Sequence, residues 1–172
     1  MRKTILVTLL LTFTIWPLAA QEPDTISQET TLIFVRHAEK LDDGTYNPSL
    51  SKPGKERAVR LANLLLKDYH IAAIYSTSYN RALETAQPLA DSLEIQVLTY
   101  DMSDPNTLIE KLITEFRGQE VLIVGHSNTT PLLVNTTLGV GMYEQLDEKA
   151  YGYIFIVQAS GLGKAGAEQI SY

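Results

Sequence analysis

Two histidines and two arginines come directly or soon after apolar runs of this chain: Arg36, His37, Arg81 and His126. Guanidinium groups bind phosphate oxygens through paired hydrogen bonds, and a neutral imidazole is a nucleophile. Arg36 and His37 follow Leu32–Val35, a run typical of a buried strand. Such a strand would deliver both side chains to a sheet edge, where ligands bind in open α/β folds. Taken alone, the pair is equally consistent with a polar loop.

Further apolar runs predict the elements that would bring these residues together. Strands are expected near 31–36, 71–75, 95–100, 121–124, 154–157 and 167–172. Helices are expected from 51, over 82–93, from 104 and around 131–138. This alternation predicts an α/β fold, a three-layer α/β/α sandwich whose mostly parallel sheet has helices on both faces. Parallel strands end at one edge, so the four side chains should converge there, with Asp101 after the third strand.

Local signals predict where several elements begin and end. Ser51 is a good helix N-cap, and Pro53 stands in the first turn of the helix that follows. Pro88 predicts a kink or an early end of the second helix. Residues 161–166 spell G-x-G-x-x-G, but too few residues follow them for a helix. We therefore interpret this segment as a hairpin turn.

The composition limits which classes of protein and of site are possible. The chain has 172 residues, 45% of them hydrophobic, and a formal net charge of −6. This length fits one globular domain, and the acidic balance argues against a nucleic-acid partner, which would need a clustered basic face. The absence of cysteine excludes disulfides, thiolate metal sites and cysteine nucleophiles.

The N-terminal residues 1–20 have the order of a secretory signal peptide. Arg2 and Lys3 precede the apolar run Ile5–Trp16, which is short for a membrane span of about 20 residues. We expect cleavage after Ala20 and a periplasmic or secreted protein without a membrane span. An uncleaved anchor is the alternative. Residues 21–29 would then be a flexible lead-in and residues 30–172 a single domain.

Three motifs in this order resemble the histidine phosphatase superfamily, and more narrowly its phosphoglycerate-mutase-like branch. They are Arg36-His37 after a strand, S-Y-N-R-A-L-E-T-A over 78–86, and V-G-H-S over 124–127. The segment from Asn47 to Ala58 is also similar to a stretch of the family. The chain departs from the family pattern at Ala38, where Gly is usual, and at Asn47, where Asp is common.

The resemblance implies a role for each of the four residues. His37 would accept the phosphoryl group, Arg36 and Arg81 would hold its oxygens, and His126 would stabilise its charge. The physical chemistry agrees, because nearby guanidinium groups disfavour protonation of an imidazole and neutralise the phosphoryl oxygens. No metal or cofactor is then required. A zinc ion bound by His37, His126 and a carboxylate is disfavoured because two arginines would repel it.

Other side chains are candidates for lesser roles. A leaving alkoxide needs a proton, and Asp101 has the best predicted position for the acid, with Glu39, Asp104 and Glu84 as rivals. Short members of the family could instead lack a protein acid and act on good leaving groups such as phosphoramidates. The expected substrate contacts are those of Arg36, Arg81, Asn47, Ser127 and Glu39, although Glu39 could equally face water.

We therefore expect a small exported phosphomonoester hydrolase that forms a phosphohistidine on His37. Its partner would be a small phosphorylated substrate, such as a sugar phosphate or an envelope-linked phosphate. Two alternatives stay open: a phosphohistidine or phosphoramidate phosphatase, and a pseudo-phosphatase that binds anions or a partner without turnover. The sequence predicts no oligomeric state.

Overall fold

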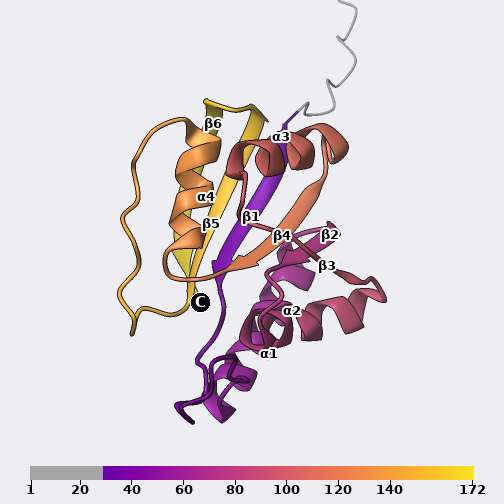
Figure 1. Ribbon diagram of the computed structural model, residues 1–172. Coiled ribbons are helices and arrows are strands. Elements are labelled where there is room, and N and C mark those ends of the chain that lie inside the picture. The colour runs from indigo at the N-terminus through magenta and orange to yellow at the C-terminus, as the bar shows by residue number, and fades with distance from the viewer. Residues whose placement is uncertain (1–28) are drawn as a thin grey trace, which may run out of the picture.

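The apolar run that ends at Arg36 forms β1 (Thr30–Arg36), an inner strand of a six-stranded sheet (Figure 1). The computed structural model describes residues 29–172, so the predicted signal peptide and nearly all of the lead-in lie outside the described residues. The other strands are β2 (Ile71–Ser76), β3 (Val97–Thr99), β4 (Glu120–Gly125), β5 (Tyr153–Gly161) and β6 (Lys164–Ser171).

The strand order is β3-β2-β4-β1-β5-β6. The pairs β1–β4, β2–β4 and β2–β3 are parallel, whereas β5 is antiparallel to both of its neighbours. The prediction of a mostly parallel sheet is therefore confirmed. The third strand is shorter than expected, and it ends two residues before Asp101.

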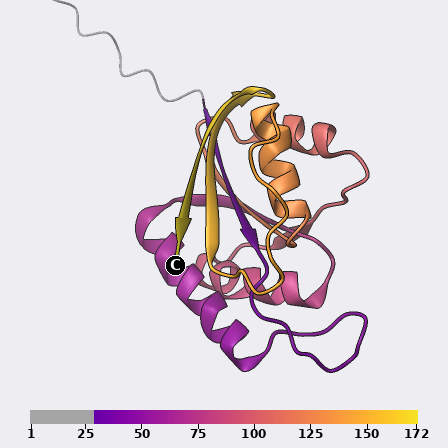
Figure 2. The ribbon, with the colours of Figure 1, turned by 90° about the vertical axis from the view of Figure 1, so that its left-hand side faces the viewer.

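Two pairs of helices cover the sheet. Helices α1 (Lys52–Asp68) and α2 (Asn80–Leu93) pack on one face, and α3 (Pro105–Glu115) and α4 (Thr129–Leu138) pack on the other (Figure 2). This arrangement confirms the three-layer α/β/α sandwich. The apolar β1 side chains from Leu32 to Val35 point alternately to the two faces and are fully buried on both, as expected for an inner strand of a sheet covered by helices.

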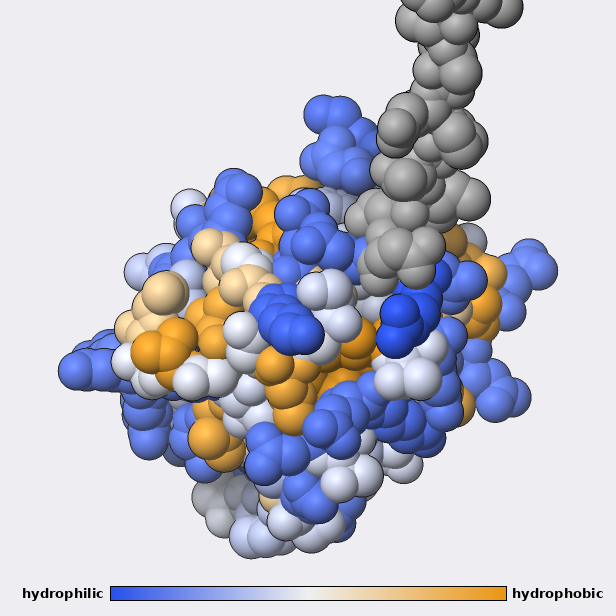
Figure 3. Space-filling view, turned by 90° about the horizontal axis from the view of Figure 1, so that it is seen from above, coloured by the Kyte–Doolittle hydropathy of each residue, from blue (hydrophilic) through white to orange (hydrophobic). Residues whose placement is uncertain are grey.

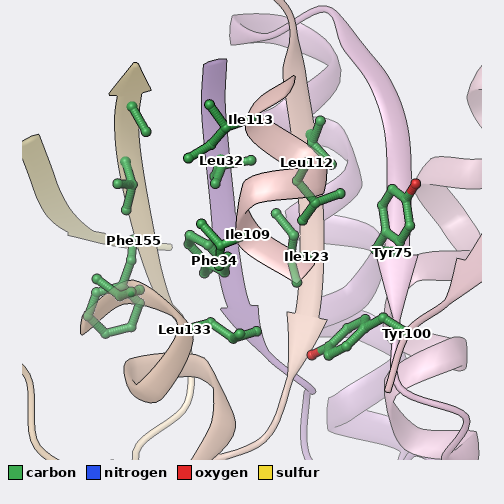
Figure 4. Close-up of a cluster of buried hydrophobic side chains, with 14 of the residues drawn as sticks. Leu32, Phe34, Tyr75, Tyr100, Ile109, Leu112, Ile113, Ile123, Leu133 and Phe155 are labelled. Carbon is green, nitrogen blue, oxygen red and sulfur yellow. The ribbon is translucent and has the colours of Figure 1, made fainter. Parts of the chain in front are cut away.

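Each face of the sheet has its own apolar core. Phe34 of β1 packs with Phe155 of β5 and with the apolar faces of α3 and α4 (Figure 4). On the other face, Ile33 and Val35 pack against α1 and α2. The two cores hold β1 in place, and its carboxyl end is therefore set by packing on both sides.

Most of the local signals describe the elements correctly. The Ser51 side chain caps α1 by accepting a hydrogen bond from the N–H of Gly54. Pro88 lies inside α2, but the helix continues to Leu93, so the predicted early end is wrong. Residues 161–166 form the β5–β6 hairpin, with Gly163 at φ +69° in the turn, so the hairpin interpretation is confirmed.

The carboxyl ends of the three central parallel strands lie together. Arg36 is paired with Gly125 across β1 and β4, and Ser76 is paired with Val124 across β2 and β4. Figure 3 shows the opposite end of the sheet, where hydrophilic residues are interspersed with smaller hydrophobic areas. Among residues 29–172, no helix is long and apolar enough to cross a membrane.

Candidate active site

A pocket of about 610 Å³ opens where β1, β2 and β4 end. Its walls include all four of the residues expected to converge: Arg36, His37, Arg81 and His126. The convergence follows from the sheet register, because the N–H of His37 donates to the Gly125 carbonyl at 2.9 Å, which places His37 beside the start of the His126 segment. The pocket is therefore the candidate active site.

His37 is held as a neutral imidazole with one nitrogen turned to the arginines. Its ring Nδ1 lies 2.7 Å from the carbonyl oxygen of Ala38, which can only accept, so Nδ1 carries the proton. Its Nε2 accepts a hydrogen bond from Nε of Arg81 at 3.1 Å. Burial, and then the charges of His126, Arg81 and Arg36, lower the pKa of His37 to about 3. At neutral pH its Nε2 lone pair is available as a nucleophile.

His126 lies next to His37, with 5.2 Å between the ring centroids. Its Nδ1 is 3.4 Å from Nη2 of Arg81, which can only donate, and its Nε2 is 2.9 Å from Oγ1 of Thr77. The proton of the neutral ring therefore sits on Nε2. Burial and the charges of Arg81 and Arg36 lower the pKa of His126 to about 4.

Arg81 connects the two imidazoles. It stands in the first turn of α2, and its guanidinium carbon lies 4.5 Å from the ring centroid of Tyr79. The Tyr79 ring also packs edge-on against His126, with centroids 5.1 Å apart. One aromatic residue thus supports both a cation and an imidazole of the pocket.

Arg36 is almost fully buried, with 4% of its surface exposed. Its Nη1 donates to the carbonyl oxygens of Asp147 at 2.7 Å and Ala150 at 3.1 Å, and Nη2 pairs with Glu148 at 3.2 Å. Within residues 29–172, Nε of Arg36 is the buried side-chain polar atom without a hydrogen-bond partner. A buried donor left unpaired costs about 1–3 kcal/mol, and a hydrogen bond to a bound anion would remove this cost.

The segment 139–152 between α4 and β5 supplies residues that the sequence patterns did not indicate. Its carbonyl groups and Glu148 bind Arg36, and the Tyr151 ring lies 4.3 Å from the Arg36 guanidinium carbon. Glu148 also accepts a hydrogen bond from Oγ of Ser127 at 3.0 Å. No motif marks this segment, and its contacts to Arg36 span 111 to 114 residues of sequence.

The N-termini of α2 and α4 both border the pocket. The lining includes Thr77, Ser78, Tyr79, Ser127, Asn128 and Thr129. Ser127 is buried and is paired with Glu148. Backbone N–H groups at helix starts favour a bound anion, which supports the prediction that Ser127 belongs to the substrate site.

Two predicted substrate contacts lie outside the pocket. Glu39 forms an ion pair with Arg57 of α1, through three contacts between 2.6 and 2.9 Å, and does not line the pocket. Asn47 accepts a hydrogen bond from the N–H of Asn80 at 2.9 Å and so caps α2 in place of its own N-cap, Tyr79. Both predictions are corrected: these side chains hold the 39–50 loop against the helices.

The rival acids are also bound elsewhere. Glu84 accepts a hydrogen bond from the N–H of Leu50, and Asp104 caps α3 through Thr107. Asp101 does line the pocket, but it is exposed, and hydrogen bonds from Ser103 lower its pKa. A lowered pKa favours the carboxylate, which is the wrong form for an acid at neutral pH.

Ala38, where the family usually has Gly, is fully buried. It packs against Leu50 and Ala58, and its N–H donates to Oγ1 of Thr85 at 2.9 Å. The methyl group therefore fills space between the 39–50 loop and α1. In residues 29–172, no three His, Cys, Asp or Glu side chains lie together in an arrangement that could hold a metal ion.

The comparisons with known proteins agree with this geometry. Residues 32–102 match the model of the histidine phosphatase superfamily (branch 1), a range that contains Arg36, His37 and Arg81. No curated protein matches the sequence.

Solved structures match the whole fold. The protein histidine phosphatase SixA complexed with tungstate has a TM-score of 0.67 at 18% identity, covering 82% of this chain and 96% of that one. A phosphoserine phosphatase mutant from Entamoeba histolytica, in complex with phosphoserine, has a TM-score of 0.63 at 17% identity, covering 80% and 94%. A mycobacterial glucosyl-3-phosphoglycerate phosphatase has a TM-score of 0.63 at 15% identity, covering 84% of this chain and 98% of that one. At these identities the likeness establishes the fold.

The match to the family model covers residues 32–102, less than half of the chain, and the solved structures share its fold. The resemblance predicted from the three motifs is confirmed. The family model that matches and the solved structures compared above are those of phosphatases.

Proposed function

We propose that the chain hydrolyses phosphomonoesters through a phosphohistidine formed on Nε2 of His37. The observation that carries this proposal is the neutral His37, whose Nε2 is hydrogen-bonded to Arg81 in a pocket that Arg36 also lines. A nucleophile with its lone pair free at neutral pH lies beside two guanidinium groups that can hold the phosphoryl oxygens.

In the first step, the substrate phosphate accepts hydrogen bonds from the unpartnered Nε of Arg36 and from Arg81. Arg81 then donates to the phosphoryl oxygens instead of to His37 Nε2, which attacks phosphorus. The P–N bond forms while the P–O bond to the leaving group breaks, and the leaving oxygen takes up a proton from solvent water. Nδ1–H keeps donating to the Ala38 carbonyl oxygen, whose partial negative charge stabilises the positive charge on the ring.

In the second step, water attacks the phosphorus of phosphohistidine. The P–N bond breaks, Nε2 recovers its lone pair and inorganic phosphate leaves. His126 lies on the other side of Arg81, where it can donate to a phosphoryl oxygen when protonated or hold Arg81 when neutral. In this proposal, Arg36 and Arg81 supply the charge neutralisation that a metal ion supplies in other phosphatases.

A second candidate reaction is hydrolysis of a P–N bond, as in phosphohistidine. The lowered pKa of Asp101 favours it, because substrates with good leaving groups need no strong protein acid. SixA, which shares the fold, is described as a protein histidine phosphatase. Parallel rate measurements on an alkyl phosphate and a phosphoramidate separate the two reactions.

The test of the main proposal is His37→Ala. Loss of the nucleophile should lower kcat on p-nitrophenyl phosphate by about 10³-fold or more. Rapid acid-free quenching of the unaltered protein with labelled substrate should trap an acid-labile, base-stable phosphoryl group, which the variant lacks. His70→Ala is the matched control, because His70 lies outside the pocket. Full activity of the His37 variant would overturn the proposal.

A pseudo-phosphatase gives a different pattern. Inorganic phosphate would raise Tm in a manner that needs Arg36 and Arg81, while hydrolysis stays at background for a panel of sugar phosphates, phosphoamino acids and phosphohistidine. Turnover that depends on His37 excludes this alternative.

We also propose that the protein is exported after cleavage behind Ala20, on the support of the n-, h- and c-region order of residues 1–20. Export would favour sugar phosphates or envelope-linked phosphates as substrates. Intact mass of the protein recovered from the cell envelope tests this proposal, since cleavage gives an N-terminus at Gln21 and an anchor retains Met1.

A further inference from the structure

Glu148 places a carboxylate in the pocket, beside the arginine that would bind phosphate. Its Oε2 lies 3.2 Å from Nη2 of Arg36, and its Oε1 accepts from Oγ of Ser127 at 3.0 Å. The Glu148 side chain is 70% exposed, so a molecule in the pocket can reach it. A carboxylate oxygen can accept two hydrogen bonds, so both oxygens keep capacity for a ligand.

A bound phosphate would not need to displace Glu148. Nη1 of Arg36 is occupied by two carbonyl oxygens and Nη2 meets Glu148, whereas Nε is buried without a partner. If Nε takes a phosphoryl oxygen, Glu148 can keep its contact to Nη2. The carboxylate and the phosphate then bind the same guanidinium group, so the charge of Glu148 stands close to the bound substrate.

The charges around the phosphate position are unusual for a site that binds a dianion. Besides Arg36 and Arg81, the charged residues that line the pocket are Lys40, Asp101 and Glu148. Outside the arginine pair, the pocket lining therefore has two carboxylate groups and one ammonium group. A leaving group with a positive charge gains from this surface, and one with a second negative charge meets repulsion.

We propose that Glu148 is a specificity-determining residue, which selects phosphomonoesters whose leaving group carries an ammonium group close to the phosphate and disfavours those that carry a carboxylate there. The inference rests on the proposed phosphatase function of the same pocket. Because the carboxylate is partly exposed, the effect is moderate: an exposed ion pair changes an equilibrium constant by up to roughly fivefold. Attraction in one substrate and repulsion in the other combine to a preference of about tenfold.

A matched substrate pair tests the inference. O-phosphoethanolamine and 2-phosphoglycolate have short leaving groups of opposite charge, and the ratio of their kcat/KM values is the readout. The unaltered protein should prefer phosphoethanolamine by about tenfold, and added salt should reduce the preference. Glu148→Gln, which keeps the shape and hydrogen-bonding oxygen, should bring the ratio close to one. Glu144→Gln removes the same charge from the same segment, outside the pocket, and should keep the ratio.

Several outcomes contradict the inference. An unchanged ratio in Glu148→Gln overturns it, as does loss of the preference in Asp101→Asn but not in Glu148→Gln. In either case His37-dependent turnover of p-nitrophenyl phosphate leaves the proposed function intact. If no substrate is turned over, calorimetric binding of the same pair to the proteins with and without Glu148→Gln still measures the preference. Selective binding without turnover would support Glu148 and overturn the proposed function.

Discussion

Two regions of the molecule build the pocket in different ways. The ends of β1 and β4 carry His37 and His126 on backbone that the sheet register and two apolar cores hold in place. The segment 139–152 is irregular and reaches Arg36 through two carbonyl groups and Glu148. In the proposed mechanism the strand ends supply the reacting groups, whereas the segment holds one arginine and places a carboxylate beside it.

This difference indicates a division of labour within one site. In the proposed mechanism, the groups that must keep a fixed geometry stand on the sheet, and the group proposed to face the leaving part of the substrate stands on a connecting segment. Loops positioned by a rigid scaffold commonly carry such specificity. The following experiments test whether the two regions are separable in this way, from the largest expected effect to the smallest.

The strongest test compares the two arginines. Arg36→Ala and Arg81→Ala should each lower kcat/KM for p-nitrophenyl phosphate by about 10³-fold, since each removes charge from the transition state. Only Arg36→Ala leaves the Asp147 and Ala150 carbonyl oxygens without their donor, which should cost about 2–3 kcal/mol of unfolding free energy. Urea unfolding measures this, and equal stability losses would mean that the 139–152 segment does not depend on Arg36.

A second test uses pH on the strand-end histidines. The pKa of His37 is lowered to about 3 and that of His126 to about 4, so the unfolded chain binds more protons below pH 6.5. Their contribution to stability is complete above pH 6.5 and is lost as pH falls toward 4. The expected slope is about 1.4 kcal/mol per pH unit for each histidine. Unfolding of the ligand-free protein between pH 7 and 4.5 measures it, and His37→Asn should have a shallower slope. A parallel slope would contradict the neutral, buried His37.

A third test concerns the Glu39–Arg57 pair, which sequence patterns assigned to the substrate and the structure places outside the pocket. Glu39→Gln should lower the unfolding free energy by about 1 kcal/mol, because this ion pair is only partly buried. Its kcat/KM on p-nitrophenyl phosphate should stay within about twofold of the unaltered protein. A tenfold increase in KM would instead support the prediction that Glu39 contacts the substrate.

The smallest expected effect is on product inhibition. Glu148→Gln removes a negative charge next to Arg36, so inorganic phosphate should inhibit it about threefold more strongly, as expected for one partly exposed charge. Competitive inhibition against p-nitrophenyl phosphate measures this, with Glu144→Gln as the control. Weaker inhibition in Glu148→Gln would show that the carboxylate supports phosphate binding instead of opposing it.

The sequence alone determined the layers of the fold and the core of the site. Strand and helix periods are local properties, so the order of elements and the N-cap at Ser51 follow from neighbouring residues. The rule that parallel strands end at one edge then predicted that Arg36, His37, Arg81 and His126 converge. Both results need only the order of elements and not the details of their packing.

Only the tertiary structure decided which polar side chains face the pocket. Glu39 and Glu148 are both exposed or half-buried acids in loops, and nothing local distinguishes them. Glu39 pairs with Arg57 because the start of α1 packs against the Glu39 backbone, where Ser51 donates to the Glu39 carbonyl oxygen. Glu148 contacts Arg36 across 112 residues of sequence. A polar side chain hydrogen-bonds to the partner that packing brings within about 3 Å, and that distance is set by elements far apart in the chain.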